Sequence, residues 1–248
     1  MNRDLYKRIL NEYKELINDK KKTNVVQFTY DKNRPIKKGD IPNNVTHLTF
    51  GCYFNQELKE GDIPNGVLNV NFSDLYGFSS KKIVIPESVK ILTLSNIFNK
   101  PLKEGDIPNG VTHIYFGDNF NQSLKEGDIP KSVTHIYFGD NFNQPLKEGD
   151  IPNSVIYLSF GDNFNQPLTP KIIPNSVVHL YLGDNFNQSL KEGDIPYGVK
   201  IFIFGHKFNQ QLEQGILPNS IKKLSFGKKF NHPLKEGDIP NSVIELFF

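Results

Sequence analysis

A repeat of constant length constrains this chain more than any other feature. The dipeptide Ile-Pro, once replaced by Leu-Pro, recurs every 22 residues from Ile41 to Ile239 without an insertion. Phe-Asn keeps the same step from Phe54 to Phe230, except in the second unit, which has Tyr76 and a glycine instead. Units this small cannot bury an apolar face alone, but stacked units can bury a continuous core. The period therefore predicts a repeat solenoid.

Each unit contains one short segment with the alternation of a strand. From Ile129, one unit reads IPKSVTHIYFGDNFNQPLKEGD, and its V-x-x-I-x-F part, which has Leu for Ile in other units, alternates with a period of two. Proline lacks an N–H and should precede the strand, and Gly139 should end it. We expect about eleven 22-residue coils, mostly β and coil, with one parallel sheet. The expected inward pairs run from Val26/Phe28, the weakest, to Leu246/Phe248.

Two polar patterns follow the strand in each unit. The asparagine of Phe-Asn recurs where serine or lysine would serve a solvated surface equally well, so we expect its amide to bond backbone groups in a bend. The alternative is a ligand role. Lys-Glu-Gly-Asp, as in Lys147 to Asp150, is interpreted as a solvated turn whose charges line one edge. A calcium site is less compatible with it, because the usual loop spacing is missing.

The two ends of the chain differ from the repeat. Residues 1–22 carry an apolar stripe of Leu5, Ile9, Tyr13 and Leu16 at helical spacing, which predicts an N-terminal α-helix before a solenoid of residues 23–248. That helix would either cap the first coil or dock onto another protein. The last strand would leave an open edge at Phe248, which favours self-association.

The outward side chains of the sheet are the expected recognition surface. In the middle of the chain they are aromatic, and tyrosine and histidine are common in binding patches. The alternatives are cross-strand stacking that only stabilises the sheet, or the copying of one ancestral unit. The predicted partner-binding residues are His113, Tyr115, His135, Tyr137, Tyr157, His179 and Tyr181.

Other classes of function find little support. A net charge of +2 gives no reason to expect nucleic acid or a membrane as partner. Cys52 is the single cysteine, there is no signal or spanning segment, and a cytoplasmic protein is expected. No catalytic motif occurs, so we expect no enzyme and no cofactor. His113 and His135 would need a convergent third ligand to hold a metal, and none is expected.

The repeat resembles that of the FNIP family. Phe-Asn-Gln-Pro-Leu, followed by Gly-x-Ile-Pro-x-Ser-Val, occurs between Phe142 and Val155. The resemblance implies a leucine-rich-repeat-like solenoid. Relatives occur in social amoebae and in giant viruses of amoebae, so a viral protein of this kind is expected in the cytoplasm of the host cell. Some viral members carry an N-terminal F-box and act as substrate adaptors for a ubiquitin ligase. The F-box is absent here, so the implied role is a scaffold that binds an unidentified protein.

Overall fold

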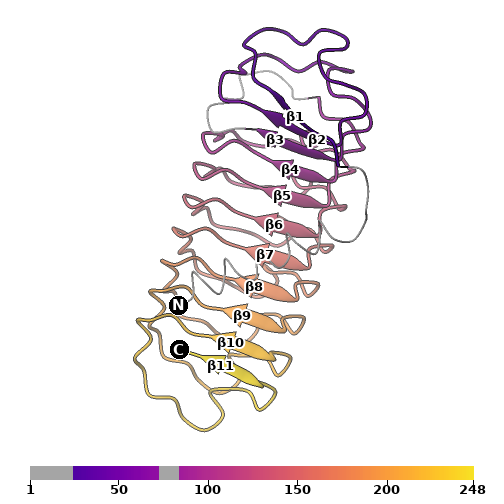
Figure 1. Ribbon diagram of the computed structural model, residues 1–248. Helices are drawn as coiled ribbons and strands as arrows, with labels where there is room; N and C mark the ends of the chain where they lie inside the picture. The colour runs from indigo at the N-terminus through magenta and orange to yellow at the C-terminus, as the bar shows by residue number, and fades with distance from the viewer. Residues whose placement is uncertain (1–24, 73–83) are drawn as a thin grey trace.

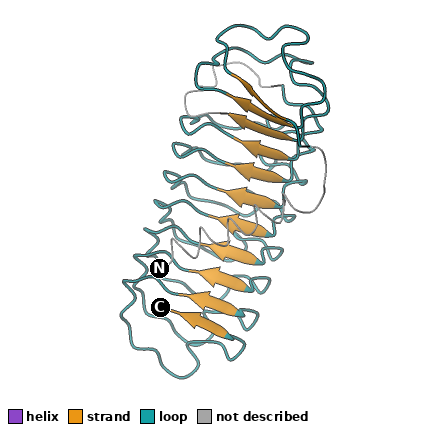
Figure 2. Cartoon of the chain, in the orientation of Figure 1, coloured by secondary structure: helices purple, strands orange, loops and turns teal. Residues whose placement is uncertain are grey.

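The computed structural model describes residues 25–72 and 84–248, in which every coil contributes one strand to a single parallel sheet (Figure 1). The eleven strands lie side by side in chain order. Figure 2 shows the strands as one layer, with the loops of each coil arching away from both strand ends. The strands are β1 Gln27–Tyr30, β2 His47–Phe50, β3 Asn69–Phe72, β4 Ile91–Thr93, β5 His113–Tyr115, β6 His135–Tyr137, β7 Tyr157–Ser159, β8 His179–Tyr181, β9 Ile201–Ile203, β10 Lys223–Ser225 and β11 Glu245–Phe247.

Strand pairing confirms the sequence register from β2 to β11. Leu48 pairs with Val70, and the same step of one repeat carries through to Leu246. The first coil corrects the prediction, because Phe28 pairs with Leu48 and Tyr30 with Phe50. The inward pair of the first rung is therefore Phe28/Tyr30 rather than Val26/Phe28. Both alternatives place apolar side chains on the same face, since they differ by two residues.

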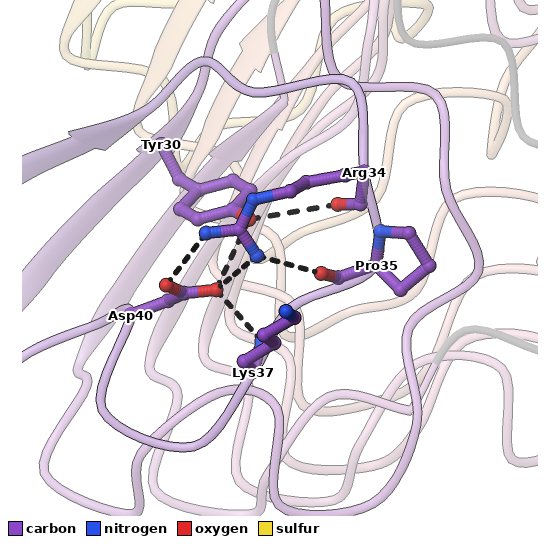
Figure 3. A network of polar contacts seen from close by, with 5 residues as sticks. All are labelled: Tyr30, Arg34, Pro35, Lys37 and Asp40. Carbon is purple, nitrogen blue, oxygen red and sulfur yellow. Dashed lines mark hydrogen bonds and ion pairs between the residues drawn. The ribbon is translucent and has the colours of Figure 1, made fainter.

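A local polar network favours the shifted first strand (Figure 3). The ring of Tyr30 lies 6.4 Å from that of Phe50 and 5.5 Å from that of Phe54, so one side chain fills space next to two core rings. Its hydroxyl lies 3.4 Å from Asp40 Oδ2, and Arg34 binds both oxygens of that carboxylate at 2.7 and 2.8 Å. The hydrogen bond from Arg34 holds the pKa of Asp40 well below its usual range.

The core lies between the sheet and the returning loops, and each coil fills it with the same set of side chains. In the coil that starts at Ile129, the buried members are this isoleucine, Val133, Ile136, Phe138, Phe142 and Leu146. The phenylalanines of Phe-Asn stack along the solenoid, with ring centroids 6.1 Å apart between Phe142 and Phe164. Exact repetition brings like side chains into contact with like, so apolar burial continues from coil to coil.

The asparagine of Phe-Asn forms the predicted structural ladder. The side-chain Oδ1 of Asn121 accepts the backbone N–H of Asn143, and Asn143 accepts that of Asn165, both at 2.9 Å. The following glutamine adds a second donor, as Gln166 Nε2 does to Asn143 Oδ1 at 3.1 Å. The backbone in this bend therefore bonds to the preceding coil through a side chain, which confirms the interpretation from sequence.

We expect Asn143→Ala to lower the free energy of unfolding by about 2 kcal/mol, because it leaves the half-buried N–H of Asn165 without its acceptor and removes one of the two acceptors of the Gln166 amide. Urea unfolding followed by circular dichroism measures the change. Asn141→Ala is the matched control, since Asn141 bonds neighbouring amides on the exposed surface and should cost less than about 0.5 kcal/mol. Equal losses in the two variants would contradict the ladder's role.

The Lys-Glu-Gly-Asp turn is less solvated than its composition predicts. Asp128, Asp150, Asp194 and Asp238 are buried, and their carboxylates accept the backbone N–H three residues earlier, as Asp150 Oδ2 does from Lys147 at 2.7 Å. The glycine of this turn adopts a positive φ, 94° at Gly149. The lysine and glutamate remain on the surface, so only half of the predicted charged edge is solvated.

Some expectations concern segments beyond the described residues. The predicted helix of residues 1–22 lies outside them, and so does the irregular unit after Phe72 apart from its last residues. Within residues 25–72 and 84–248, the structure shows no helix of the length and apolarity that a bilayer crossing needs.

Candidate functional site

The pairing of β5 to β9 brings the predicted binding residues together on the outward face of the sheet. They form two rows along the solenoid. The first row is His113, His135, Tyr157, His179 and Ile201, and the second is Tyr115, Tyr137, Ser159, Tyr181 and Ile203. We call these ten residues the outward patch. The sequence predicted seven of them and missed Ile201, Ile203 and Ser159 as members.

The rings of the outward patch stack on one another because their residues pair across neighbouring strands. The rings of Tyr115 and Tyr137 stack nearly parallel with their centroids 4.3 Å apart, and those of His113 and His135 stack at 4.0 Å. Tyr157 departs from its row, because its ring lies 4.8 Å from Tyr137 and 5.0 Å from Tyr181, which belong to the other row. The small Ser159 leaves space between those two tyrosines. The patch is thus interlocked across both rows, and cross-strand stacking contributes to the stability of the sheet.

Burial corrects the expectation that these tyrosines face solvent. Tyr157, Tyr181 and Tyr137 keep 1%, 2% and 5% of their surface exposed, and Ile203 keeps 7%. The four residues form an apolar cluster separate from the solenoid core, with Tyr115 and Ile201 packed against it. His113, His135, His179 and Tyr115 are only half-buried. The margins of the patch meet solvent, and its centre does not.

Two histidines of the patch are held by the threonine that precedes each of them. The hydroxyl of Thr112 lies 3.1 Å from the carbonyl of Lys90 and 2.9 Å from His113 Nδ1, and Thr134 makes the same contacts around His135 at 3.1 and 2.8 Å. Each hydroxyl therefore links the histidine ring to the backbone of the preceding coil.

The histidines are neutral at physiological pH. Burial lowers the pKa of His113 to about 4 and that of His135 to about 3, the latter with further contributions from His113 and His179. Burial also lowers the pKa of His179. The outward patch is therefore an uncharged surface of aromatic and aliphatic groups with polar edges, suited to an apolar partner surface rather than to an anion.

The described residues offer little for catalysis or metal binding. Among residues 25–72 and 84–248, no group of three histidine, cysteine or acidic side chains converges. Cys52 is an exposed free thiol in a bend. His113 and His135 stack face to face, an arrangement that does not direct two ring nitrogens at one ion.

A second feature, missed from the sequence, is a groove lined by amides. Asn141, Asn163 and Asn185 each donate a side-chain N–H to the asparagine one coil earlier, at 3.0, 2.9 and 2.7 Å. This exposed ladder runs beside the structural one, and asparagines of both line a shallow groove. The recurrence of asparagine in Gly-Asp-Asn-Phe could have predicted this ladder from the sequence. Because the amides bond one another, the stacking of the coils accounts for the row of asparagines in the groove.

Comparison with known proteins supports the repeat and the fold. A family model described as FNIP Repeat matches residues 33–75, 54–96, 98–141, 142–185 and 186–229. The chain is similar to CroV588, whose crystal structure is described as a novel circular LRR protein, with a TM-score of 0.83 and 37% sequence identity. The similarity covers 89% of this chain and 33% of that one, so the chain spans about a third of CroV588. No curated protein gives a significant match.

Proposed function

The chain belongs to the FNIP-repeat family of leucine-rich-repeat-like solenoids, and on that premise we propose that it is a non-enzymatic scaffold that binds a protein partner on the outward face of its sheet. The observation that carries the proposal is the outward patch. A sheet whose outer face serves only solvation needs no apolar cluster there, whereas Tyr137, Tyr157, Tyr181 and Ile203 form one. Its neutral histidines and stacked tyrosines suit a partner that offers apolar side chains.

The half-buried margin is the part of the patch that a partner reaches first. His113, Tyr115 and His135 lie there, on β5 and β6, and present polar tips on apolar bodies. Tyrosine is among the residue types most enriched in binding hot spots. The buried tyrosines pack against the residues of the margin, so changing them would disturb folding as well as binding.

The test is affinity capture from amoebal lysate with the full chain as bait, followed by binding measurements on the purified partner. We expect the double variant Tyr115→Ser with His135→Ser to weaken binding at least tenfold, as loss of a hot spot does. Tyr197→Ser is the matched control, because Tyr197 is an exposed tyrosine away from the sheet face. Circular dichroism checks that both variants keep the solenoid. The proposal fails if the double variant binds the same protein as tightly as the control does.

A second candidate function is self-association through the last strand. Among the described residues β11 pairs with β10 alone, and Leu246 and Phe247 of this strand and the following Phe248 are exposed. An edge of this kind accepts another strand. The solution mass separates the two candidates: a concentration-dependent dimer that Phe247→Lys with Phe248→Lys converts to monomer favours self-association. A chain that stays monomeric at all concentrations excludes it.

A further inference from the structure

Six lysines lie on two neighbouring coils near the end of the chain. These coils contain β9 and β10, which pair side by side (Figure 1). All six lysines are exposed, and within the described part of the chain only Lys223 has a carboxylate partner, Glu245 on β11 at 2.8 Å. We call the group the lysine band, and its members are Lys200, Lys207, Lys222, Lys223, Lys228 and Lys229. Five of its charges are therefore not neutralised by the described residues.

The lysine band departs from the repeat at three places of the unit in the same two coils. The residue before the strand is uncharged in the four preceding coils, and it is replaced by Lys200 and Lys222. In the Gly-Asp-Asn bend after the strand, asparagine is replaced by Lys207 and Lys229, and aspartate by a histidine and then by Lys228. Like charges at matching places of adjacent coils repel each other. Copying of one ancestral unit does not produce this change, and solvation alone does not need it.

The lysine band borders the outward face of the sheet at both ends of the strands. Lys222 takes the place in its unit of Thr134, whose hydroxyl lies 2.8 Å from the ring of the outward His135. Lys228 lies in the bend at the other end of β10, and the chain between the two lysines spans at most about 20 Å at roughly 3.3 Å per residue. Ile203, on the adjacent strand between these ends, belongs to the outward patch. The band is therefore continuous with the patch.

The coils before the lysine band have the opposite charge. Residues 107–194 contain five lysines against ten acidic residues, a net charge of −5, whereas residues 195–248 contain seven lysines against four, a net charge of +3. In the coils of β5 to β8, the bend that follows the strand carries an aspartate. A nucleic acid strand or an anionic membrane presents its charges over a wider area than two coils and would meet these aspartates. The charge pattern therefore favours a short acidic segment.

We propose that the lysine band binds a short acidic segment of the partner protein, extended across β9 and β10 beside the apolar part that the outward patch binds. The assignment rests on the proposed function, because it makes the segment part of the same partner. One extended stretch of about six residues spans the interval between the two ends of the strands, so its carboxylates reach the lysines at both. The partner is thus a protein with adjacent apolar and acidic residues, and the charges fix its direction along the solenoid.

The experiment titrates the full chain into fluorescein-labelled octaglutamate at low ionic strength and follows the fluorescence anisotropy. We expect the wild type to bind the peptide, with an affinity that falls as salt is added. The triple variant Lys222→Gln, Lys228→Gln and Lys229→Gln should bind at least tenfold more weakly, because it removes three of the five charges that no described carboxylate neutralises.

The matched control is the triple variant Lys103→Gln, Lys125→Gln and Lys147→Gln. It removes the same charge from exposed lysines of the Lys-Glu-Gly-Asp turns and should bind octaglutamate as the wild type does. Circular dichroism checks that both triple variants keep the solenoid. Equal affinities of the two variants overturn the proposal, and so does a wild type that binds no octaglutamate.

Three further probes compare the other occupants of the lysine band. An oligothymidylate of matched charge that binds the wild type more tightly than octaglutamate overturns the proposal in favour of nucleic acid. Vesicles that contain phosphatidylserine do the same in favour of a membrane. A dimer of the wild type at low ionic strength, abolished in the lysine-band variant, assigns the band to the acidic coils of a second copy and overturns it as well.

The octaglutamate titration and the partner capture fail independently. Tyr115→Ser with His135→Ser leaves the lysine band intact, so this variant should still bind octaglutamate while it loses the partner. Octaglutamate binding that depends on the lysines supports the band as a site for acidic peptide even if no partner is captured. A captured partner that binds the lysine-band variant as tightly as its matched control supports the scaffold and rejects the acidic segment.

Discussion

Gly161→Ala is expected to lower the free energy of unfolding by about 3 kcal/mol or more, the range of severe backbone and core defects. A Cβ at this position would lie 1.9 Å from the carbonyl oxygen of Gly139 and 2.4 Å from its carbonyl carbon. Both are backbone atoms of the preceding coil, so no side-chain rotation relieves the overlap. The two coils must separate locally, which weakens the strand pairing of β6 with β7 and the packing of the phenylalanines beneath.

Urea unfolding of Gly161→Ala gives the change in stability, and Gly105→Ala separates the steric overlap from backbone strain. Gly105 has a φ of 86° with open space where its Cβ would be, so alanine there costs only the strain of a left-handed residue, about 1 kcal/mol. Equal costs at the two positions would show that the close approach of the coils is absent in solution. The same contact recurs at Gly117, Gly139, Gly183, Gly205 and Gly227, so we expect it to govern coil stacking throughout.

Acidification from about pH 7 to about pH 4.5 is expected to destabilise the protein by roughly 2 kcal/mol through His113 and His135, after allowance for their partial exposure. Burial lowers the pKa of these two groups to about 4 and about 3, from 6.5 in the unfolded chain. Between these values the unfolded state binds a proton at each histidine and the folded state does not. Stability is therefore complete above about pH 6.5 and falls as the pH falls toward 4.

The pH dependence is measured by urea unfolding at a series of pH values, for the wild type and for His113→Gln with His135→Gln. Glutamine stays neutral, so the double variant should show a smaller loss on acidification. Burial raises the pKa of Asp128, Asp150 and Asp194, which favours the folded state at still lower pH, and the series should stop at about pH 4.5 for that reason. Parallel pH profiles for the two proteins would contradict the burial of the histidines.

The period of the sequence predicted most of the fold because one local pattern decides each coil. Leu158 and Phe160 are buried as predicted, and Leu158 pairs with Leu180, since a fixed period and an alternation of two leave one consistent register. The pattern failed at the first coil, where Val26/Phe28 and Phe28/Tyr30 satisfy the same alternation. The choice there depends on Arg34 and Asp40, whose contacts with Tyr30 are formed only in the folded chain.

The candidate site was predictable in its position but not in its burial. The spacing of His113, His135 and His179 is enough to place them on adjacent or nearby rungs, which pairing confirms. The burial of Tyr157 involves ring contacts with Tyr137 and Tyr181 on the neighbouring strands, and alternation within one strand contains no information about such contacts. The ring of Tyr157 lies next to that of Tyr137 in the other row because Ser159 is small, and the sequence of a single repeat unit does not predict this contact.

The asparagine ladder also gives the solenoid a direction. Each bond runs from the backbone of one coil to the side chain of the coil before it, as from Asn209 to Asn187 and from Asn231 to Asn209. Each coil therefore donates a backbone N–H to the coil before it and accepts one from the coil after it, so the two ends of the ladder differ. Two such molecules can extend the ladder only by joining head to tail, so any assembly that continues it forms a ring or a filament rather than a two-fold symmetric dimer.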